Sequence, residues 1–130
     1  MTKIIIACFL FISFVVYSGF IYTRGTANNI KLSGSEQKMI AHGKQIYQQY
    51  NCQACHQIYG LGGYLGPDLT TAYSDSHRGK FLIKAMLISG GNRMPAFQFN
   101  NEQTEAIIAY LKYVDTTATS LKSRIRQELH

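Results

Sequence analysis

The chain has 130 residues, of which 46% are hydrophobic and two are prolines, so it favours one small domain with an appendage over two domains. Its formal net charge is +6. We expect no nucleic-acid partner despite this charge, because the chain combines a long apolar segment with no recognition motif.

The first predicted element is the apolar segment at residues 4–22, which contains no charged residue. As a helix it would span about 28 Å, close to the thickness of a bilayer's hydrocarbon core. We therefore predict a membrane anchor over residues 1–24 in preference to a cleaved signal peptide, whose apolar region would be shorter and would end at a small-residue site. Cys8 is interpreted as a membrane-embedded thiol. The flanking charges do not settle the orientation of the anchor.

A polar linker at residues 25–34 leads into the main predicted domain, residues 35–115. Ser33 or Ser35 opens the first helix of this domain, and Ser33 and Glu36 have the spacing of a capping box. Apolar residues recur along the helix at intervals of three and four and predict one buried stripe, formed by Met39, Ile40, Gly43, Ile46, Tyr47 and Tyr50. Gly43 on this stripe allows another helix to cross closely, and the expected partner is the last helix, residues 101–114.

The strongest motif is Cys52-Gln53-Ala54-Cys55-His56. Two thiols three positions apart, followed by a histidine, form the pattern to which haem vinyl groups are joined while the imidazole takes an axial position on the iron. At this spacing both sulfurs can lie on one side of a single helical turn. Without the histidine, a redox dithiol or half of a zinc site would compete with this interpretation. We predict one covalently bound haem c, attached through Cys52 and Cys55, with His56 as an iron ligand.

The next segment, residues 60–69, is too rich in glycine for a regular element, and its backbone can approach a porphyrin closely. Metal-bound histidines usually donate their other ring N–H to an acceptor, and we expect a carbonyl of the Gly66–Pro67 turn to accept from His56. Pro67 is therefore a predicted haem-site residue. Tyr64 is another, and it either bonds a haem propionate or covers the haem without a specific bond.

Met94 is the predicted second iron ligand. A thioether suits a low-spin iron at raised potential, and Pro95 stiffens the backbone that carries the sulfur. Met86 and His77 are the alternatives. The default for a methionine is an ordinary position in the core.

Three further elements are predicted. Residues 79–89 form a helix that stops at two glycines. Phe97 and Phe99 are expected to line the haem, although plain core positions are the default for aromatic residues. The tail, residues 116–130, forms either a basic amphipathic helix that lies on acidic lipid or a partner subunit, or a frayed end. We predict no strand.

Residues 43–114 resemble a class I c-type cytochrome domain, most similar to the membrane-anchored cytochrome c subunit of bacterial nitric oxide reductase. The similarity is carried by the segment that ends in Cys52-Gln53-Ala54-Cys55-His56, by the Gly-Gly-Tyr loop with its Gly-Pro-Asp-Leu run, by the Met94–Pro95 pair and by the closing helix. It implies an all-α fold, in which a single N-terminal transmembrane helix precedes about three to five helices around one covalent haem. It also implies that the haem lies on the periplasmic or outer side of the bacterial cytoplasmic membrane.

An iron held by His56 and Met94 has no open position for substrate, so the domain is predicted to relay single electrons without a catalytic centre of its own. The expected partners are a multi-span, haem-containing catalytic subunit, with that of nitric oxide reductase as the first choice, a soluble or membrane-bound electron donor, and membrane lipid. The alternatives are the cytochrome c subunit of an oxygen-reducing haem–copper oxidase, a free-standing anchored shuttle and a haem gas sensor.

Overall fold

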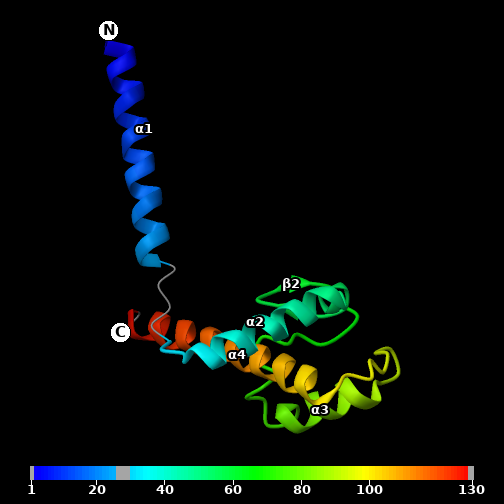
Figure 1. Cartoon of the computed structure of the whole chain (residues 1–130). Coiled ribbons are helices and arrows are strands. Elements are labelled where there is room, and N and C mark those ends of the chain that lie inside the picture. Colours follow the sequence, from blue (N-terminus) through cyan, green and yellow to red (C-terminus); the bar gives the residue numbers. More distant parts are fainter. Residues whose placement is uncertain (1, 26–29, 129–130) are drawn as a thin grey trace. The chain divides into compact units, whose positions relative to one another are not determined.

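The computed structural model describes residues 2–25 and 30–128, and the chain divides into two units, residues 1–31 and 32–130. The first unit holds helix α1 (Thr2–Phe20) and a π-helical turn, η1 (Ile21–Gly25). The second unit holds, in order along the chain (Figure 1), α2 (Gly34–Gln49), the 3₁₀ turn η2 (Cys52–Ala54), β1 (Gln57–Ile58), β2 (Leu61–Gly62), α3 (Gly79–Ser89) and α4 (Asn101–Glu128). Helices dominate both units, which confirms the predicted all-α class.

Helix α1 is uncharged from Ile4 onward and buries none of its residues within the chain. The segment Thr2–Thr23 reaches a mean hydropathy of 2.6 and is long enough to cross a membrane. Near its end, the hydroxyl of Thr23 donates to the carbonyl of Gly19 at 2.9 Å, so this polar side chain satisfies a backbone group of its own helix. An apolar helix without a buried face agrees with the predicted membrane anchor.

Helix α2 begins with the predicted capping box. The hydroxyl of Ser33 accepts from the backbone N–H of Glu36 at 3.3 Å, and the Glu36 carboxylate accepts from the backbone N–H of Ser33 at 2.8 Å. The cap is therefore Ser33 rather than Ser35. Of the predicted linker before it, residues 26–29 lie outside the described residues.

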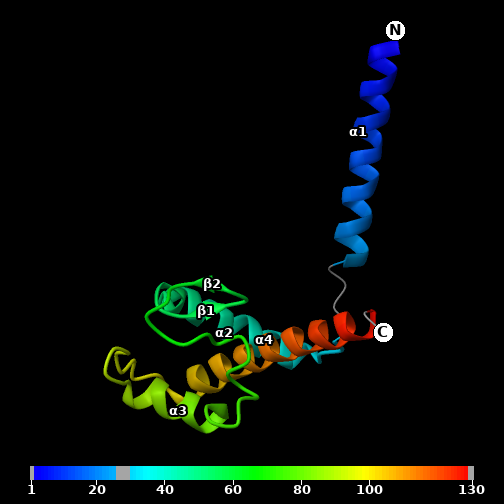
Figure 2. The ribbon, with the colours of Figure 1, turned by 180° about the vertical axis from the view of Figure 1, so that it is seen from behind.

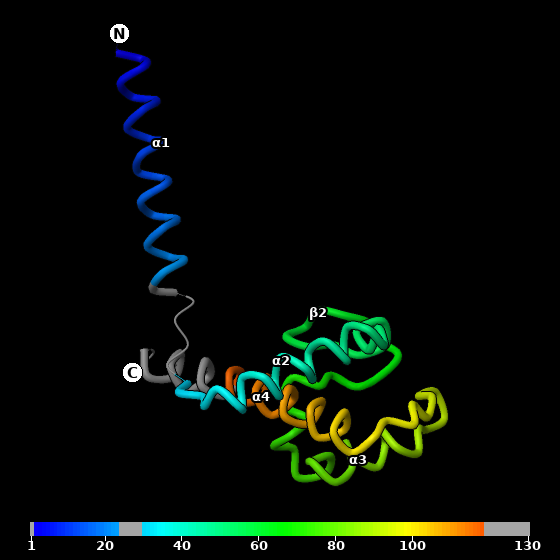
Figure 3. Tube along the Cα trace, in the orientation of Figure 1, coloured from blue at the N-terminus to red at the C-terminus, as the bar shows by residue number. Residues whose placement is uncertain are grey.

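Helices α2 and α4 cross in close contact at Gly43, as predicted. A Cβ built on Gly43 would lie 1.9 Å from the carbonyl oxygen of Ala106, so only glycine permits this approach. Views from the front and from behind show the two helices side by side (Figures 1 and 2). The tube shows the crossing without the ribbon (Figure 3). The main core cluster, joined by residues of α3 and the loop after it, packs at this crossing and consists of Ile46, Leu87, Phe99, Ala106, Ile107 and Leu111.

The predicted stripe of α2 is buried only near the crossing. Gly43, Ile46 and Tyr47 are buried, whereas Met39 and Tyr50 are exposed, so the prediction was wrong at both ends of the stripe. Two crossing helices touch closely only near the crossing point. Tyr50 packs its ring edge-on against Phe99 instead, with ring centroids 4.7 Å apart.

Helix α3 has the predicted bounds and ends at Gly90, which adopts a φ of +67°. A positive φ of this kind favours glycine, and it turns the chain out of the helix. Lys80 and Lys84 of α3 form ion pairs with Glu105 of α4 at 3.2 and 3.1 Å. These contacts fix α3 against the first turns of α4.

Helix α4 begins at a reciprocal cap, in which the side chain of Asn100 accepts from the N–H of Gln103 and the Gln103 side chain accepts from the N–H of Asn100. It runs on to Glu128, so the predicted end at residue 114 was wrong. The sequence from 115 to 128 has no proline or glycine to stop the helix. The backbone of residues 116–128 is therefore helical. The side chains of residues 119–128, on which the predicted amphipathic pattern of the tail depends, lie outside the described residues.

A small antiparallel hairpin, β1–β2, contradicts the prediction of no strand and of an irregular loop from residue 60. Tyr59 and Gly60 both adopt positive φ values, 55° and 75°, as the two central residues of the tight hairpin turn. Tyr59 also donates its hydroxyl to the carbonyl of Val114 at 3.1 Å, which ties the hairpin to α4. The sequence lacked the usual Asn-Gly turn signal because tyrosine occupies the first of these positions.

Candidate functional site

The second unit encloses an apolar cavity of about 480 Å³. Its wall contains five of the six predicted site residues, Cys52, Cys55, His56, Pro67 and Met94. The other lining residues are Tyr47, Tyr50, Asn51, Leu65, Gly66, Leu69, Ala72, Arg78, Leu82, Ile83, Met86, Leu87, Gly91, Asn92, Arg93, Pro95, Phe97, Ile107 and Leu111. The cavity has the size and the apolar character of a cofactor site.

The two cysteines of the motif enter the cavity from a tight turn. Asn51, with a φ of 50°, lies between the end of α2 and η2 and redirects the chain. The backbone N–H groups of Cys55 and His56 both donate to the carbonyl of Cys52, at 3.2 and 3.0 Å. This turn brings both thiols and the imidazole into one wall, as the spacing predicted.

The chemistry of the cysteine pair does not fit its two rivals. Burial raises the pKa of the Cys52 thiol, whereas a reactive redox thiol needs a lowered pKa. In the described part of the chain, no three His, Cys, Asp or Glu side chains gather to complete a zinc site. Two half-buried thiols beside an apolar cavity fit attachment of a porphyrin.

His56 is held in one orientation by its second nitrogen. Its Nδ1 lies 2.8 Å from the carbonyl oxygen of Pro67, the acceptor predicted from the sequence. Because a carbonyl can only accept, Nδ1 is the proton donor in this bond, and in the neutral ring this tautomer leaves the lone pair on Nε2. A Cβ on Gly66 would lie 2.4 Å from Cε1 of this imidazole, so the ring occupies space that only glycine leaves open.

Met94 reaches the cavity from the loop between α3 and α4. The N–H of Gly91 donates to the carbonyl of Met94 at 2.8 Å, which closes the loop that begins at Gly90. Of the two rival ligands, Met86 also lines the cavity, whereas His77 does not. Of the three residues predicted as candidates for the second iron ligand, the two methionines line the cavity.

Of the three aromatic residues predicted near the haem, one lines the cavity and two lie outside its wall. Phe97 lines the cavity, whereas Phe99 is buried behind it, stacked on Phe97 with ring centroids 5.2 Å apart. Tyr64 is 87% exposed and is not part of the wall. A haem-site role for Tyr64 stays a prediction.

Sequence reasoning missed the polar part of the wall. Tyr47, predicted only as core, is 5% exposed, and its hydroxyl has no hydrogen-bond partner among the described residues. Burial raises its pKa, so the hydroxyl stays a neutral donor. A buried, unused donor at an apolar cavity fits a site built to receive a group with acceptors of its own. The sequence held little indication of this role for Tyr47, since a tyrosine in the apolar stripe of a helix is usually an ordinary core residue.

Comparison with known proteins gives the same picture. Residues 38–111, more than half of the chain, match the family described as "Cytochrome C oxidase, cbb3-type, subunit III". The C subunit of nitric oxide reductase from Halomonas halodenitrificans is 25% identical over 118 residues, which are 82% of this chain and 76% of that protein. Its counterpart from Stutzerimonas stutzeri is 25% identical over 117 residues, 82% of this chain and 80% of that protein.

A third relative matches a shorter part of the chain. Cytochrome c-555 of Methylococcus capsulatus is 30% identical over 73 residues, which are 56% of this chain and 58% of that protein. Cytochromes c carry haem c, so this similarity agrees with the composition of the cavity wall. The chain is a membrane-anchored c-type cytochrome, similar to the C subunit of nitric oxide reductase, and belongs to the family of cytochrome c oxidase, cbb3-type, subunit III.

Proposed function

We propose that this cytochrome relays single electrons to the catalytic subunit of a membrane respiratory complex, with nitric oxide reductase as the first choice. The observation that supports this most is the apolar cavity whose wall combines Cys52, Cys55, His56 and Met94. When bound there, haem c supplies a one-electron carrier. The chain supplies the attachment points, the iron ligands and an apolar surrounding.

Each residue has a defined task in this proposal. Cys52 and Cys55 form the thioether bonds to one haem c. His56 offers Nε2 to the iron, because Pro67 holds the proton on Nδ1. Met94 offers its thioether from the other ligand loop. If His56 and Met94 both ligate the iron, the protein would leave no place for a substrate, which favours a relay over a gas sensor.

The choice of partner rests on the relatives. The two nitric oxide reductase subunits match 82% of this chain, which is more than the haem domain alone. The family description favours the second candidate, an electron-entry subunit of an oxygen-reducing haem–copper oxidase. A free-standing shuttle has no such support.

The proposed arrangement assigns residues 1–24 to the anchor, 25–34 to the linker, 35–115 to the haem domain and 116–130 to the tail. The anchor crosses the cytoplasmic membrane once, and the haem domain lies on its periplasmic or outer side. Tethering raises the effective concentration of the haem domain over a membrane partner. A soluble or membrane-bound donor supplies the electrons, and the tail contacts lipid or the partner.

The deciding experiment is purification of the full chain from its native membrane in mild detergent. We expect mass spectrometry to show one added haem, and we expect a multi-span haem subunit to co-purify. Turnover of nitric oxide by the isolate supports the first candidate, turnover of oxygen alone supports the second, and isolation without a partner supports the shuttle. A mature polypeptide without added haem refutes the proposal altogether.

The iron ligand is tested separately with two methionine variants. We expect Met94→Ala to lose the weak far-red absorption band of methionine-ligated ferric haem, whereas Met86→Ala keeps it. Both residues line the same cavity, so Met86→Ala controls for loss of packing. The reverse result would assign the ligand to Met86.

A further inference from the structure

Helix α3 presents apolar side chains on its outer face as well as on its inner face. On the inner face, Leu87 is buried and Ile83 packs against the core cluster. On the outer face, Phe81 and Ile88 are 89% and 49% exposed, and the exposed residue Ala85 lies between them. The spacing of four and then three residues places these three side chains, the α3 row, on one face of the helix. A helix that is apolar on two sides is expected to be covered on both.

The cofactor site does not account for the α3 row. Neither Phe81 nor Ile88 is part of the cavity wall, so a haem bound in the cavity would leave both side chains uncovered. Within the described part of the second unit, α4 packs on one side of α3, and no other helix or strand lies on its far side (Figures 1 and 2). The α3 row therefore faces away from the domain.

The charge around the α3 row is one-sided. Residues 76–101 contain no aspartate or glutamate and four cations, Arg78, Lys80, Lys84 and Arg93. The carboxylates of Asp75 and Glu105, which flank this segment, pair with the first three of these cations. A positive surplus therefore remains, and the side chains of both lysines are still partly exposed. Apolar side chains flanked by cations favour an anionic, apolar surface as the binding partner.

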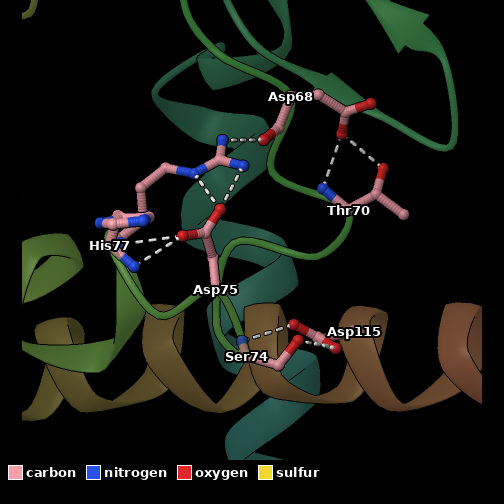
Figure 4. A network of polar contacts seen from close by, with 7 residues as sticks. Asp68, Thr70, Ser74, Asp75, His77 and Asp115 are labelled. Atoms are coloured by element: carbon pink, nitrogen blue, oxygen red, sulfur yellow. Dashed lines mark hydrogen bonds and ion pairs between the residues drawn. The ribbon is translucent and has the colours of Figure 1, made fainter.

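Hydrogen bonds in front of α3 hold this face in place on the domain. The N–H and the hydroxyl of Ser74 donate to the carboxylate of Asp115 on α4, at 2.7 and 3.0 Å (Figure 4). Next along the chain, Arg78 forms an ion pair with Asp75 at 2.7 Å and donates to the carbonyl of Asp68 at 2.9 Å. The α3 row is therefore a preorganised surface, which lowers the cost of binding.

We propose that the outer face of α3 binds the surface of an anionic lipid bilayer, with Phe81 and Ile88 at the acyl chains and the lysines at the headgroups. The chain itself brings such a surface near, because the segment Thr2–Thr23 is long enough to cross a membrane. Nine positions separate the end of η1 from the start of α2, a span of roughly 30 Å when fully extended. Because Leu82 and Met86 of α3 line the cavity, this contact also keeps the cofactor site beside the membrane. The contact needs no haem, so its failure would leave the proposed function untouched.

The test uses fluorescence, because the chain contains no tryptophan and one introduced indole reports on a single site. The haem-loaded full chain with Phe81→Trp is reconstituted into vesicles of equal parts phosphatidylcholine and phosphatidylglycerol, with or without bromine on the acyl chains. Bromine quenches indole emission on close contact, and quenching by haem is the same in both kinds of vesicle and cancels in the ratio. We expect bromine to lower the emission about twofold or more, since an interfacial helix seats its apolar face at the acyl boundary.

Tyr64→Trp is the matched control. Tyr64 is 87% exposed and lies outside the cavity wall. It lies close after β2, which is on the opposite side of α4 from α3 (Figures 1 and 2). Its emission should be nearly the same with and without bromine.

Further measurements keep the test decisive. If Phe81→Trp does not fold, Ile88→Trp places the reporter on the same face. In vesicles of phosphatidylcholine alone, quenching should fall by about half or more, because the anionic headgroups are missing; equal quenching there would overturn the assignment to anionic lipid. Reporters on α3 that respond to bromine no more than Tyr64→Trp would overturn the proposal. Shielding from an aqueous quencher that develops only when a catalytic subunit is added would assign this face to a protein and likewise overturn it.

Discussion

The crossing at Gly43 gives the sharpest prediction for stability. In Gly43→Ala, the new Cβ would lie 1.9 Å from the Ala106 carbonyl oxygen, about 1.5 Å short of the 3.4 Å at which ordinary contact begins. Because the obstacle is backbone, helices α2 and α4 must separate. Overpacking of this kind costs about 1–3 kcal/mol or more, and alanine returns roughly 1 kcal/mol of helix propensity.

We therefore expect a net loss of about 2 kcal/mol, since a shortfall this large belongs at the upper end of the overpacking range. For a domain of this size that lowers the melting temperature by roughly 8–16 °C. The assay is thermal unfolding of the haem-loaded full chain in detergent, followed by circular dichroism.

Gly34→Ala is the matched control, because it lies on the same helix with nothing within 4 Å of a built Cβ. It should melt at or slightly above the wild-type temperature. If Gly43→Ala melts as high as Gly34→Ala, the close crossing does not exist.

Three other predictions follow from the site and the caps. Gly66→Ala pushes a Cβ to within 2.4 Å of the His56 ring, so it should weaken the Nδ1 bond to Pro67. That bond makes the imidazole a more basic ligand, which favours ferric iron, so weakening it should raise the reduction potential. Gly34→Ala is the control, because nothing lies within 4 Å of its built Cβ. Hydrogen bonds from Ser33 lower the pKa of Glu36, so the wild-type protein should be more stable than Glu36→Gln above pH 4.5. This difference in stability should shrink as the pH falls below 4.5, because the carboxylate becomes protonated. A difference that stays constant with pH would contradict an ionised cap. The Cys52→Ala/Cys55→Ala double variant, which cannot attach haem, should unfold without a cooperative thermal transition. The reason is that the apolar side chains of the cavity wall then have nothing to pack against. A sharp transition in this variant would refute the prediction.

Local signals made much of the fold predictable. Ser33, Gly43 and Gly90 act through short-range rules of capping, close approach and turns at positive φ, and each occurs where those rules place it. The Pro67 acceptor was predictable for a similar reason, since a metal-bound imidazole needs a partner and the glycine-rich turn offers few.

Features that depend on tertiary distances were not predictable. The hairpin turn requires a positive φ at Tyr59, which no sequence rule assigns to tyrosine, and its hydroxyl is anchored on α4 far along the chain. The approach of Arg78 to the cavity depends on where Asp68 and Asp75 bring their oxygens. The apolar pattern likewise indicated where α4 packs, but not how far the helix continues after its packed face ends.

The uninterrupted course of α4 has a consequence for the proposed electron transfer. Its 28 residues form a rod about 42 Å long, in which Ile107 and Leu111 are part of the cavity wall while the final turns extend beyond the core cluster. In the proposed relay, a partner that binds the final turns of α4 would therefore also fix the distance between its own redox centre and the haem. Because electron tunnelling slows steeply with distance, the rigidity of this helix would then keep the rate of transfer constant.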